Sequence, residues 1–414
     1  MSRDAGPLSP RPSGGPSSIP QIDVMPSIEA IVHSGERLLS PAFSDLLVGY
    51  HRLRLLRDGE QTFPAMLEAI RRARSTICFE TYILRDDRTG QRFAEALMDR
   101  ARAGVEVNLL YDAWGSSVSN EFVRALRAAG VRAVEFRPIR FSFQSYKIIR
   151  QLAPRNHRKS LIVDNNTAFT GGINIADDYA SVAAGGEGWR DTHLCLEGPA
   201  AQEMQYFFLR TWRKAKGDPI DEPRYAHLGR RPDHMVRVVT SDMRKGRTSI
   251  RDWYRNAIDR AQKRIYITNA YFLPTLRLLR ELQQAARRGV DVRIMVAGTT
   301  DVTAVLLASR SIYGRLLEAG ARMYEWKGRV LHAKTAVFDG HWATVGSSNL
   351  DQQSLRLNLE SNVIVEDSRF AGAMEAMFQQ DLEHCDEITS EEWRDRPLWQ
   401  RAASWVAYLF RDWL

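Results

Sequence analysis

Short apolar runs alternate with longer amphipathic stretches along most of the chain, starting near residue 27. The apolar run over 76–84 predicts a strand, the helical periodicity over 91–103 predicts a helix, and the run over 105–111 predicts another strand. Strands that alternate with helices in this way are typical of an α/β fold.

The same order of elements recurs in the second half of the chain. The segment Ala101–Leu110 aligns with Ala286–Met295 at an offset of 185 residues. Two further pairs of segments align at offsets of 189 and 190, namely 77–82 with 266–271 and 131–136 with 321–326. A repeat of this kind indicates a duplicated structural unit, so we expect two copies of one α/β half.

The segments outside the two copies differ from them in composition. Residues 1–26 hold six of the sixteen prolines together with much Gly and Ser, which predicts a disordered tail. We expect the first half over 27–216, a Pro-, Gly- and Asp-rich linker over 217–234, and the second half over 235–390. The last residues, 391–414, form an amphipathic, Trp-rich tail.

Composition and charge narrow the class of protein. The chain has 414 residues, 44% of them hydrophobic and 26% charged, which argues against a wholly disordered, collagen-like or multi-span membrane protein. No stretch approaches the roughly 20 apolar residues that span a bilayer. The three cysteines are too few for a disulfide framework, which favours a reducing compartment. The net charge of +8 favours an anionic partner: nucleic acid, anionic lipid or a phosphorylated metabolite.

Each copy carries the same polar motif, HRKSLIVD at 157–164 and HAKTAVFD at 332–339. In both, the lysine follows the histidine by two residues and the aspartate follows the lysine by five. A glycine comes seven residues later and an asparagine three after that, Asn174 in the first copy and Asn349 in the second. Residues two apart on a strand share a face, so two facing copies would present two imidazoles and two ammonium groups to one pocket.

This set of side chains suits attack on a phosphodiester. One histidine can act as nucleophile at phosphorus while the other protonates the departing alcohol, and the roles reverse when a second alcohol resolves the phosphohistidine. The lysines and asparagines would stabilise charge on the non-bridging oxygens. We expect no metal and no cofactor, because a lysine near each histidine would repel a cation and no carboxylate cluster accompanies the pair.

The doubled HxKxxxxD pattern resembles the phospholipase D superfamily, and flanking passages are similar to its bacterial cardiolipin synthase branch, in the shorter form without N-terminal transmembrane helices. These passages are ETY at 80–82, DAWGS at 112–116, GGINIADDY at 171–179, WRDTH at 189–193, NAYFLP at 269–274, NLDQQS at 349–354 and LNLE at 357–360. The resemblance covers about residues 40–390. It implies two α/β/α sandwich halves related by a pseudo-two-fold axis, one shared active site, and transfer of a phosphatidyl group between two lipids.

The resemblance also implies roles for the motif residues. The candidate catalytic set consists of His157, Lys159, Asp164, His332, Lys334 and Asp339. Within it, His157 is similar to the family's usual nucleophile and His332 to its partner acid and base. We expect the two aspartates to brace the fold rather than to touch substrate.

Further candidates lie downstream of each motif. Asp191 and Glu360 fall at matching places, 34 and 28 residues after the histidine of their own copy, and would each hold an imidazole in the reactive tautomer. The candidate substrate-binding residues are Asn174, Asn349 and Ser347. Ser347 stands where the first copy has Gly172, so a hydroxyl donor is present on one side only.

Two segments hold aromatic and basic side chains that suit a lipid surface. The first copy has about fifteen extra residues between Arg137 and Asn156, and a solvated loop or stacking on nucleic acid bases are the alternatives there. Four of the ten tryptophans lie in the final 22 residues, where apolar residues repeat at helical spacing. Such a helix is typical of an interfacial anchor, with packing on the protein core as the alternative.

The resemblance thus favours a peripheral membrane phosphatidyltransferase that forms cardiolipin and glycerol from phosphatidylglycerol through a covalent phosphohistidine. The expected partners are phosphatidylglycerol, other anionic phospholipids and the membrane surface, with no nucleic acid. The expected location is the cytoplasmic face of the bacterial inner membrane. A phospholipase D-type hydrolase, a phosphodiesterase or nuclease acting on nucleic acid, and a lipid-binding protein with a retired site are the alternatives.

Overall fold

The computed structural model describes residues 45–138, 154–220, 234–241, 249–300 and 302–411. The tail predicted over 1–26, most of the linker predicted over 217–234 and most of the insertion between Arg137 and Asn156 lie outside these residues.

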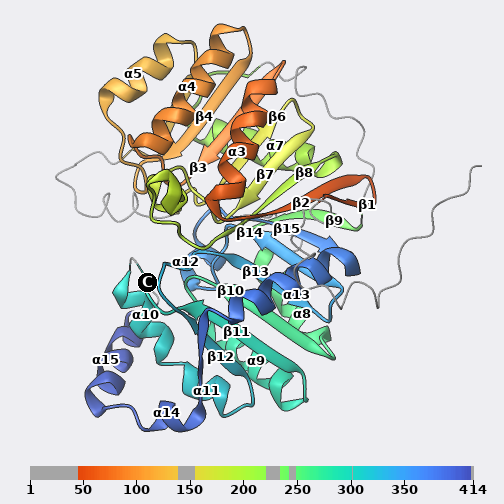
Figure 1. Ribbon diagram of the computed structural model, residues 1–414, viewed down its shortest axis with the longest axis vertical. Coiled ribbons are helices and arrows are strands. Elements are labelled where there is room, and N and C mark those ends of the chain that lie inside the picture. Colours follow the sequence, from red (N-terminus) through yellow and green to blue (C-terminus); the bar gives the residue numbers. More distant parts are fainter. Residues whose placement is uncertain (1–44, 139–153, 221–233, 242–248, 301, 412–414) are drawn as a thin grey trace, which may run out of the picture.

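Two mixed sheets of eight strands each form the framework, with the first half above the second in Figure 1. The strands of the first half are β1 (Asp45–Val48), β2 (His51–Arg57), β3 (Thr76–Thr81), β4 (Glu106–Asp112), β5 (Arg132–Phe136), β6 (Ser160–Val163), β7 (Thr167–Gly171) and β8 (Thr192–Glu197). Those of the second are β9 (Val236–Thr240), β10 (Arg264–Asn269), β11 (Asp291–Ala297), β12 (Arg322–Trp326), β13 (Lys334–Phe338), β14 (Trp342–Gly346), β15 (Ser361–Glu366) and β16 (Cys385–Ile388).

The two sheets share one topology. The first has the order β1-β2-β8-β7-β6-β3-β4-β5 and the second β16-β12-β11-β10-β13-β14-β15-β9. Read in opposite directions, the two orders correspond strand for strand, except that β1 and β16 each lack a counterpart. The duplicated α/β architecture predicted from the sequence is confirmed.

Helices cover both faces of each sheet, which makes each half an α/β/α sandwich (Figure 1). In the first half, α3 (Asp58–Arg72), α4 (Arg88–Arg102) and α5 (Asn120–Ala128) cover one face and α7 (Pro199–Lys214) the other. In the second half, α8 (Ile250–Arg260), α9 (Leu276–Arg287) and α11 (Tyr313–Leu317) cover one face and α13 (Ser368–Leu382) the other. Four further helices lie in the described part of the second half: α10 (Thr303–Arg310), α12 (Gln352–Arg356), α14 (Ser390–Arg394) and α15 (Leu398–Leu409).

The predicted elements of the first copy are present with shifted ends. The helix begins at Arg88, earlier than its periodicity indicates, because the Asp87 side chain accepts the Gly90 N–H at 2.9 Å and caps it. Strand β3 ends at Thr81 because the next residues leave the sheet, where the Ile83 N–H donates to Asn174 Oδ1 at 3.0 Å. The end of this strand is thereby tied to a candidate site residue.

One buried apolar cluster spans the boundary between the halves. It combines Phe208 and Trp212 of α7 with Val345 and Val363 of the second sheet and Phe370 of α13. Since burial of apolar surface is the main favourable term in folding, this shared cluster holds the two sandwiches together. No helix within the described ranges is long and apolar enough to cross a bilayer.

Candidate active site

A cavity of about 310 Å³ lies between the two halves and is lined by both motif histidines. Its polar and aromatic lining comes from both copies and includes Tyr82, Trp114, His157, Asn174, Tyr179, Tyr271, His332, Asn349 and Asp351. Its size falls in the range of small-molecule sites. Within the described ranges, no three His, Cys, Asp or Glu side chains converge so as to hold a metal ion.

Backbone hydrogen bonds between the halves fix the position of each histidine. The His157 N–H donates to the Leu359 carbonyl at 3.0 Å, and the Leu359 N–H donates back to the Arg155 carbonyl at 2.8 Å. In the reverse sense, the His332 N–H donates to the Arg190 carbonyl at 2.7 Å. The Arg190 N–H in turn donates to the Val330 carbonyl at 2.9 Å. Each histidine therefore directly follows an isolated parallel β-bridge to the opposite half.

The two candidate orienting carboxylates also cross between the halves. His157 Nδ1 lies 2.8 Å from Glu360 Oε1, and His332 Nδ1 lies 2.8 Å from Asp191 Oδ2. All four side chains are buried. A proton on Nδ1, shared with the carboxylate, leaves Nε2 as the nitrogen that can react with a substrate.

Burial sets the protonation of these pairs. It lowers the pKa of His157, and the nearby Glu360 carboxylate only partly offsets this effect. Burial also raises the pKa of Asp191 to about 6 against the opposing charge of Lys334. His157 is therefore held as a neutral imidazole near neutral pH, which is the form that can act as a nucleophile.

The motif lysines lie directly behind the histidines. Lys159 Nζ donates to the His157 carbonyl at 2.6 Å, and Lys334 Nζ donates to the His332 carbonyl. Both side chains are buried, and burial lowers the pKa of Lys159 to about 7. Lys159 Nζ also lies 5.2 Å from the centre of the Tyr82 ring. Two buried amines thus lie behind the histidines, where in their protonated form they can act on an anionic group at short range.

The two asparagines line the cavity, whereas the serine lies behind a carboxylate. Asn174 Nδ2 donates to the Tyr179 hydroxyl at 2.7 Å, so its amide is held in place by the protein. The Ser347 hydroxyl donates to Glu360 Oε2, and the Ser361 N–H donates to Ser347 Oγ at 3.1 Å. Ser347 was expected to bind substrate, but its place against β15 directs its hydroxyl to Glu360.

The motif aspartates lie away from the cavity, at the far ends of β6 and β13. The Asp164 carboxylate accepts N–H groups from residues 74, 75 and 76 at 2.8, 2.8 and 3.0 Å. The Asp339 carboxylate accepts those of residues 262, 263 and 264 at 2.9, 2.8 and 3.0 Å. Each aspartate therefore braces the turn that leads into the central strand of its own half, and neither lies beside the histidines.

The surroundings of His332 include residues that the motif spacing does not indicate. The rings of Tyr179 and Trp189, both from the first half, lie 5.4 and 5.8 Å from its imidazole. The Tyr179 hydroxyl is 3.4 Å from His332 Nδ1. Both residues fall within passages similar to the family, which is the one signal that marked them in the sequence.

A buried carboxyl, Asp351, also lines the cavity and was not among the candidates. Its side chain accepts the Ser354 N–H at 2.6 Å, and burial raises its pKa to about 7. At the offset of 175 that relates the two motifs, the first copy has Ala176, so no repeat marked this position.

A buried ion-pair network holds the strand beside His332. Arg190 Nη2 lies 2.6 Å from Asp381 Oδ2, in the second half, and Arg190 Nη1 lies 3.2 Å from Asp58 Oδ1, in the first. Arg57 also pairs with Asp381, at 2.7 Å. Because the Arg190 carbonyl accepts the His332 N–H, this network fixes the backbone on which the second histidine depends.

Comparisons with known proteins identify the family of this chain. The family model described as the PLD-like domain of cardiolipin synthase matches residues 66–212 and 254–382. A cardiolipin synthase of Halalkalibacterium halodurans is 36% identical over 352 residues, which cover 84% of this chain and 69% of that protein. A cardiolipin synthase of Geobacillus thermodenitrificans is 32% identical over 404 residues, covering 95% of this chain and 78% of that protein.

Solved structures show the same fold at low sequence identity. The phosphatidylserine synthase of Haemophilus influenzae superposes with a TM-score of 0.69 at 15% identity, over 88% of this chain and 94% of that one. The polyphosphate kinase of Porphyromonas gingivalis gives a TM-score of 0.56 at 14% identity, over 87% of this chain and 53% of that one.

Proposed function

The chain belongs to the cardiolipin synthase family of phospholipase D-like proteins, and from this premise we propose that it is a cardiolipin synthase, a phosphatidyltransferase. The observation that supports this most is the pair of histidines on one cavity, each held at Nδ1 by a carboxylate of the other half. Two such groups can serve as nucleophile and as acid and base within a single turnover.

In the first step, His157 Nε2 attacks the phosphorus of one phosphatidylglycerol. An N–P bond forms and the bond from phosphorus to the glycerol oxygen breaks, while protonated His332 gives its Nε2 proton to that oxygen. Glycerol leaves and the phosphatidyl group stays on His157. This assignment is supported by the lowered pKa of His157, which keeps its imidazole neutral for attack.

In the second step, the hydroxyl of another phosphatidylglycerol attacks the phosphohistidine. His332, now neutral, takes the proton of that hydroxyl as the new P–O bond forms and the N–P bond breaks. The product is cardiolipin, and both histidines return to their starting protonation. One phosphodiester is exchanged for another, so the step needs no external energy source.

The remaining candidates would support this chemistry from behind the histidines. We assign charge stabilisation of the phosphoryl oxygens to Lys159 and Lys334, and substrate contact to Asn349 and Asn174, which line the cavity. Asp191 and Glu360 would hold the tautomers. Asp164 and Asp339, with their backbone contacts, would act on stability.

We further propose a peripheral membrane protein at the cytoplasmic face of the bacterial inner membrane. The supporting observations are the net charge of +8 and the exposure of two apolar residues that line the cavity, Trp114 and Val302. The cysteines are free, and two of them, Cys78 and Cys195, are buried, which suits a reducing compartment.

Incubation of the purified protein with phosphatidylglycerol vesicles tests this function. Equal amounts of glycerol and cardiolipin are the expected products. Phosphatidic acid in place of cardiolipin would indicate a hydrolase, and cleavage of DNA without lipid turnover would refute the proposal. A phosphatidyl adduct on the protein, trapped during turnover and released by acid, is the expected sign of the phosphohistidine.

A further inference from the structure

The C-terminal helix α15 packs on the protein mainly through small residues and Tyr408, and it leaves most of its large apolar residues exposed. Ser404 is buried, and Ala403 and Ala407 are half-buried, against α10. The exposed apolar residues are Leu398, Trp399, Trp405, Val406, Leu409 and Phe410, with exposed fractions from 50 to 77%. An amphipathic helix that only packs on a core does the reverse, so this exposed face indicates an interaction surface.

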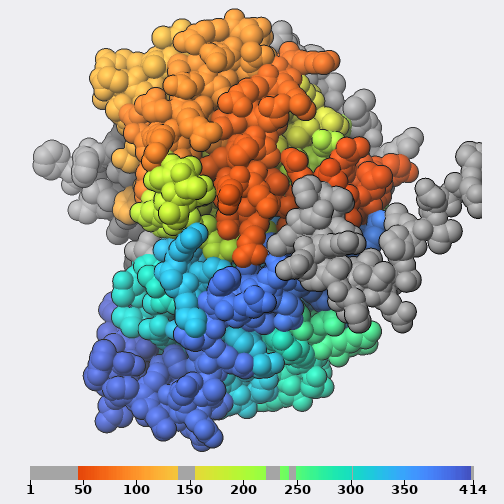
Figure 2. Space-filling model, in the orientation of Figure 1, coloured from red at the N-terminus to blue at the C-terminus, as the bar shows by residue number. Residues whose placement is uncertain are grey.

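The face lies on the outside of the molecule. In Figure 1, α15 lies beside α10 at the lower left, and in Figure 2 the C-terminal residues form part of the surface there. Strand β1, which carries the exposed Leu47, lies at the opposite side of Figure 1.

Helix α10 connects this surface with the active-site cavity. Val305 of α10 and Val302 just before it line the active-site cavity, while Leu307 and Arg310 line a second cavity beneath α15. Val302 and Trp114 are both exposed apolar residues of the first cavity. A single short helix therefore forms a wall of both cavities, and apolar side chains are exposed at each.

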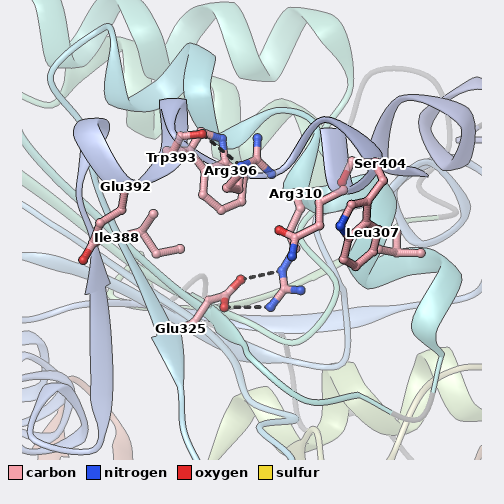
Figure 3. A pocket seen from close by; sticks show the side chains of 10 residues that line it. Leu307, Arg310, Glu325, Ile388, Glu392, Trp393, Arg396 and Ser404 are labelled. Atoms are coloured by element: carbon pink, nitrogen blue, oxygen red, sulfur yellow. Dashed lines mark hydrogen bonds and ion pairs between the residues drawn. The ribbon is translucent and has the colours of Figure 1, made fainter. Parts of the chain in front are cut away.

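The second cavity, of about 360 Å³, has basic side chains at its border with α15 (Figure 3). Arg310 is neutralised by Glu325 through two hydrogen bonds of 2.9 and 2.8 Å. The guanidinium of Arg396 lies 3.2 Å from the centre of the Trp393 ring, and its Nε donates to the Trp393 carbonyl at 3.0 Å.

Glu325 pairs directly with Arg310 and acts on Arg396 only from a longer distance. Among the described residues, no carboxylate lies within ion-pair distance of Arg396, and burial together with Arg401 and Arg310 lowers its pKa to about 10. A guanidinium stacked on an indole, with a second arginine beside it, is suited to a phosphate oxygen. The charge of this cluster thus complements an anionic headgroup.

We infer that α15 is the surface on which the protein docks to an anionic bilayer, with its apolar side chains at the headgroup boundary and Arg396 and Arg401 on lipid phosphates. Tryptophan and apolar side chains on one face of a helix, with arginines at its border, match the chemistry of such a boundary. The choice of lipid as the occupant rests on the proposed function. Through α10, docking would bring the active-site cavity to the bilayer surface, where phosphatidylglycerol is presented.

Sedimentation with vesicles tests the apolar face. The triple variant Trp399→Ser, Trp405→Ser, Phe410→Ser is expected to bind vesicles containing phosphatidylglycerol about tenfold or more weakly than the wild type. The control Leu47→Ser, at an equally exposed apolar residue on the other side, should bind as the wild type does. Unchanged binding of the triple variant would overturn the inference.

An independent measurement avoids any loss of folding. Bromine-labelled acyl chains should quench part of the tryptophan fluorescence of the wild type, and the quenched part should fall in the variant Trp399→Phe, Trp405→Phe. Equal quenching in both proteins would contradict docking through α15.

Variants that remove positive charge test the role of the two arginines in headgroup binding. The variant Arg396→Gln, Arg401→Gln should lose its preference for phosphatidylglycerol over phosphatidylcholine vesicles, while the control Arg71→Gln, Arg72→Gln, with the same change in net charge, keeps it. A preference that persists in the first variant would overturn the headgroup role of the cluster. If the triple apolar variant instead changes only self-association without vesicles, the face joins two copies of the chain and the inference is wrong.

Turnover separates this inference from the proposed function. The triple variant should lose turnover on vesicles but keep it on short-chain phosphatidylglycerol dispersed in detergent. If the wild type binds vesicles through α15 yet forms no cardiolipin, the proposed function fails and the docking surface stands. If it forms cardiolipin and the triple variant matches it on vesicles, the docking surface fails and the function stands.

Discussion

The two halves place the same side chains around the cavity but surround them differently. His157 has the Tyr82 ring of its own half at 4.7 Å. His332 has Tyr271 of its own half at 6.4 Å, and in addition Tyr179 and Trp189 of the other half. Duplication supplied two equivalent imidazoles, and the residues around them make the two positions chemically distinct.

The two orienting carboxylates also have different surroundings. Glu360, which holds His157, accepts a hydrogen bond from Ser347. Asp191, which holds His332, accepts the Thr192 N–H at 2.7 Å and packs against Gly172, where an added Cβ would lie 2.2 Å from Asp191 Oδ1. The longer acid is thus combined with serine and the shorter acid with glycine. The two histidines can therefore have different roles although their motifs match.

Replacement of either histidine should have the largest effect on turnover. His157→Ala and His332→Ala should each lower turnover by about 10³-fold or more. With a phosphatidyl ester of p-nitrophenol, whose leaving group needs no proton, His332→Ala should still release nitrophenol once and retain the covalent phosphatidyl group. His157→Ala should release none. A covalent adduct in His157→Ala would exchange the two roles, and substantial residual turnover in either would refute the two-histidine scheme.

Replacement of either orienting carboxylate by its amide should have the next largest effect on turnover. Glu360→Gln and Asp191→Asn should each lower kcat by about 10- to 100-fold, because an amide can favour the unreactive tautomer. The nitrophenyl ester should distinguish them: Glu360→Gln should slow the first release of nitrophenol, whereas Asp191→Asn should slow only the second step. The contacts cross between the halves, so the opposite pattern would show that the pairing differs in the active protein.

Changes at the glycine and serine should be smaller and unequal. Gly172→Ser forces its Cβ against Asp191 and should lower turnover by about tenfold, while Ser347→Gly removes one hydrogen bond to Glu360 and should lower it severalfold. Steady-state rates and melting temperatures of both variants provide the measurement. An effect of Ser347→Gly larger than that of Gly172→Ser would contradict the described packing.

The change of activity with pH should be the smallest of these effects. Asp191, with its pKa raised to about 6, must be ionised to hold His332, so activity should rise as pH increases through that value. Lys159, with its pKa lowered to about 7, loses its charge as pH increases further, so activity should then fall. In Lys159→Arg the fall should move to higher pH, since arginine stays charged. A profile unchanged in this variant would exclude Lys159 as the group that titrates.

The sequence predicted the doubled α/β fold and the two histidines because both are periodic features: alternating apolar runs and a motif with conserved internal spacing. It could not predict that Glu360 holds His157, because spacing along one copy relates equivalent positions and does not report which positions meet. Tyr179 and Trp189 were missed as neighbours of His332 for the same reason. The contact of Ser347 with Glu360 could not be predicted either, because the direction of its hydroxyl depends on the backbone beside β15.

The C-terminal helix shows another limit. Its apolar periodicity was visible in the sequence, but both anchoring and packing remained open there. The structure shows the packing, because Ser404 and Ala407 face the protein, and it leaves Trp399 and Trp405 exposed, so anchoring stays a prediction. Trp413, also part of the predicted pattern, lies outside the described residues.

The reciprocal backbone bridges at His157 and His332 have a consequence for the history of the chain. Contacts in which one half offers residue i to residue j of the other, and receives the same in return, are those of a symmetric homodimer about a two-fold axis. A single ancestral half that paired with itself would have had two identical histidines and two identical carboxylates. Once both copies were joined in one chain, their sequences no longer had to be the same. Glutamate with serine could then arise on one side of the site and aspartate with glycine on the other.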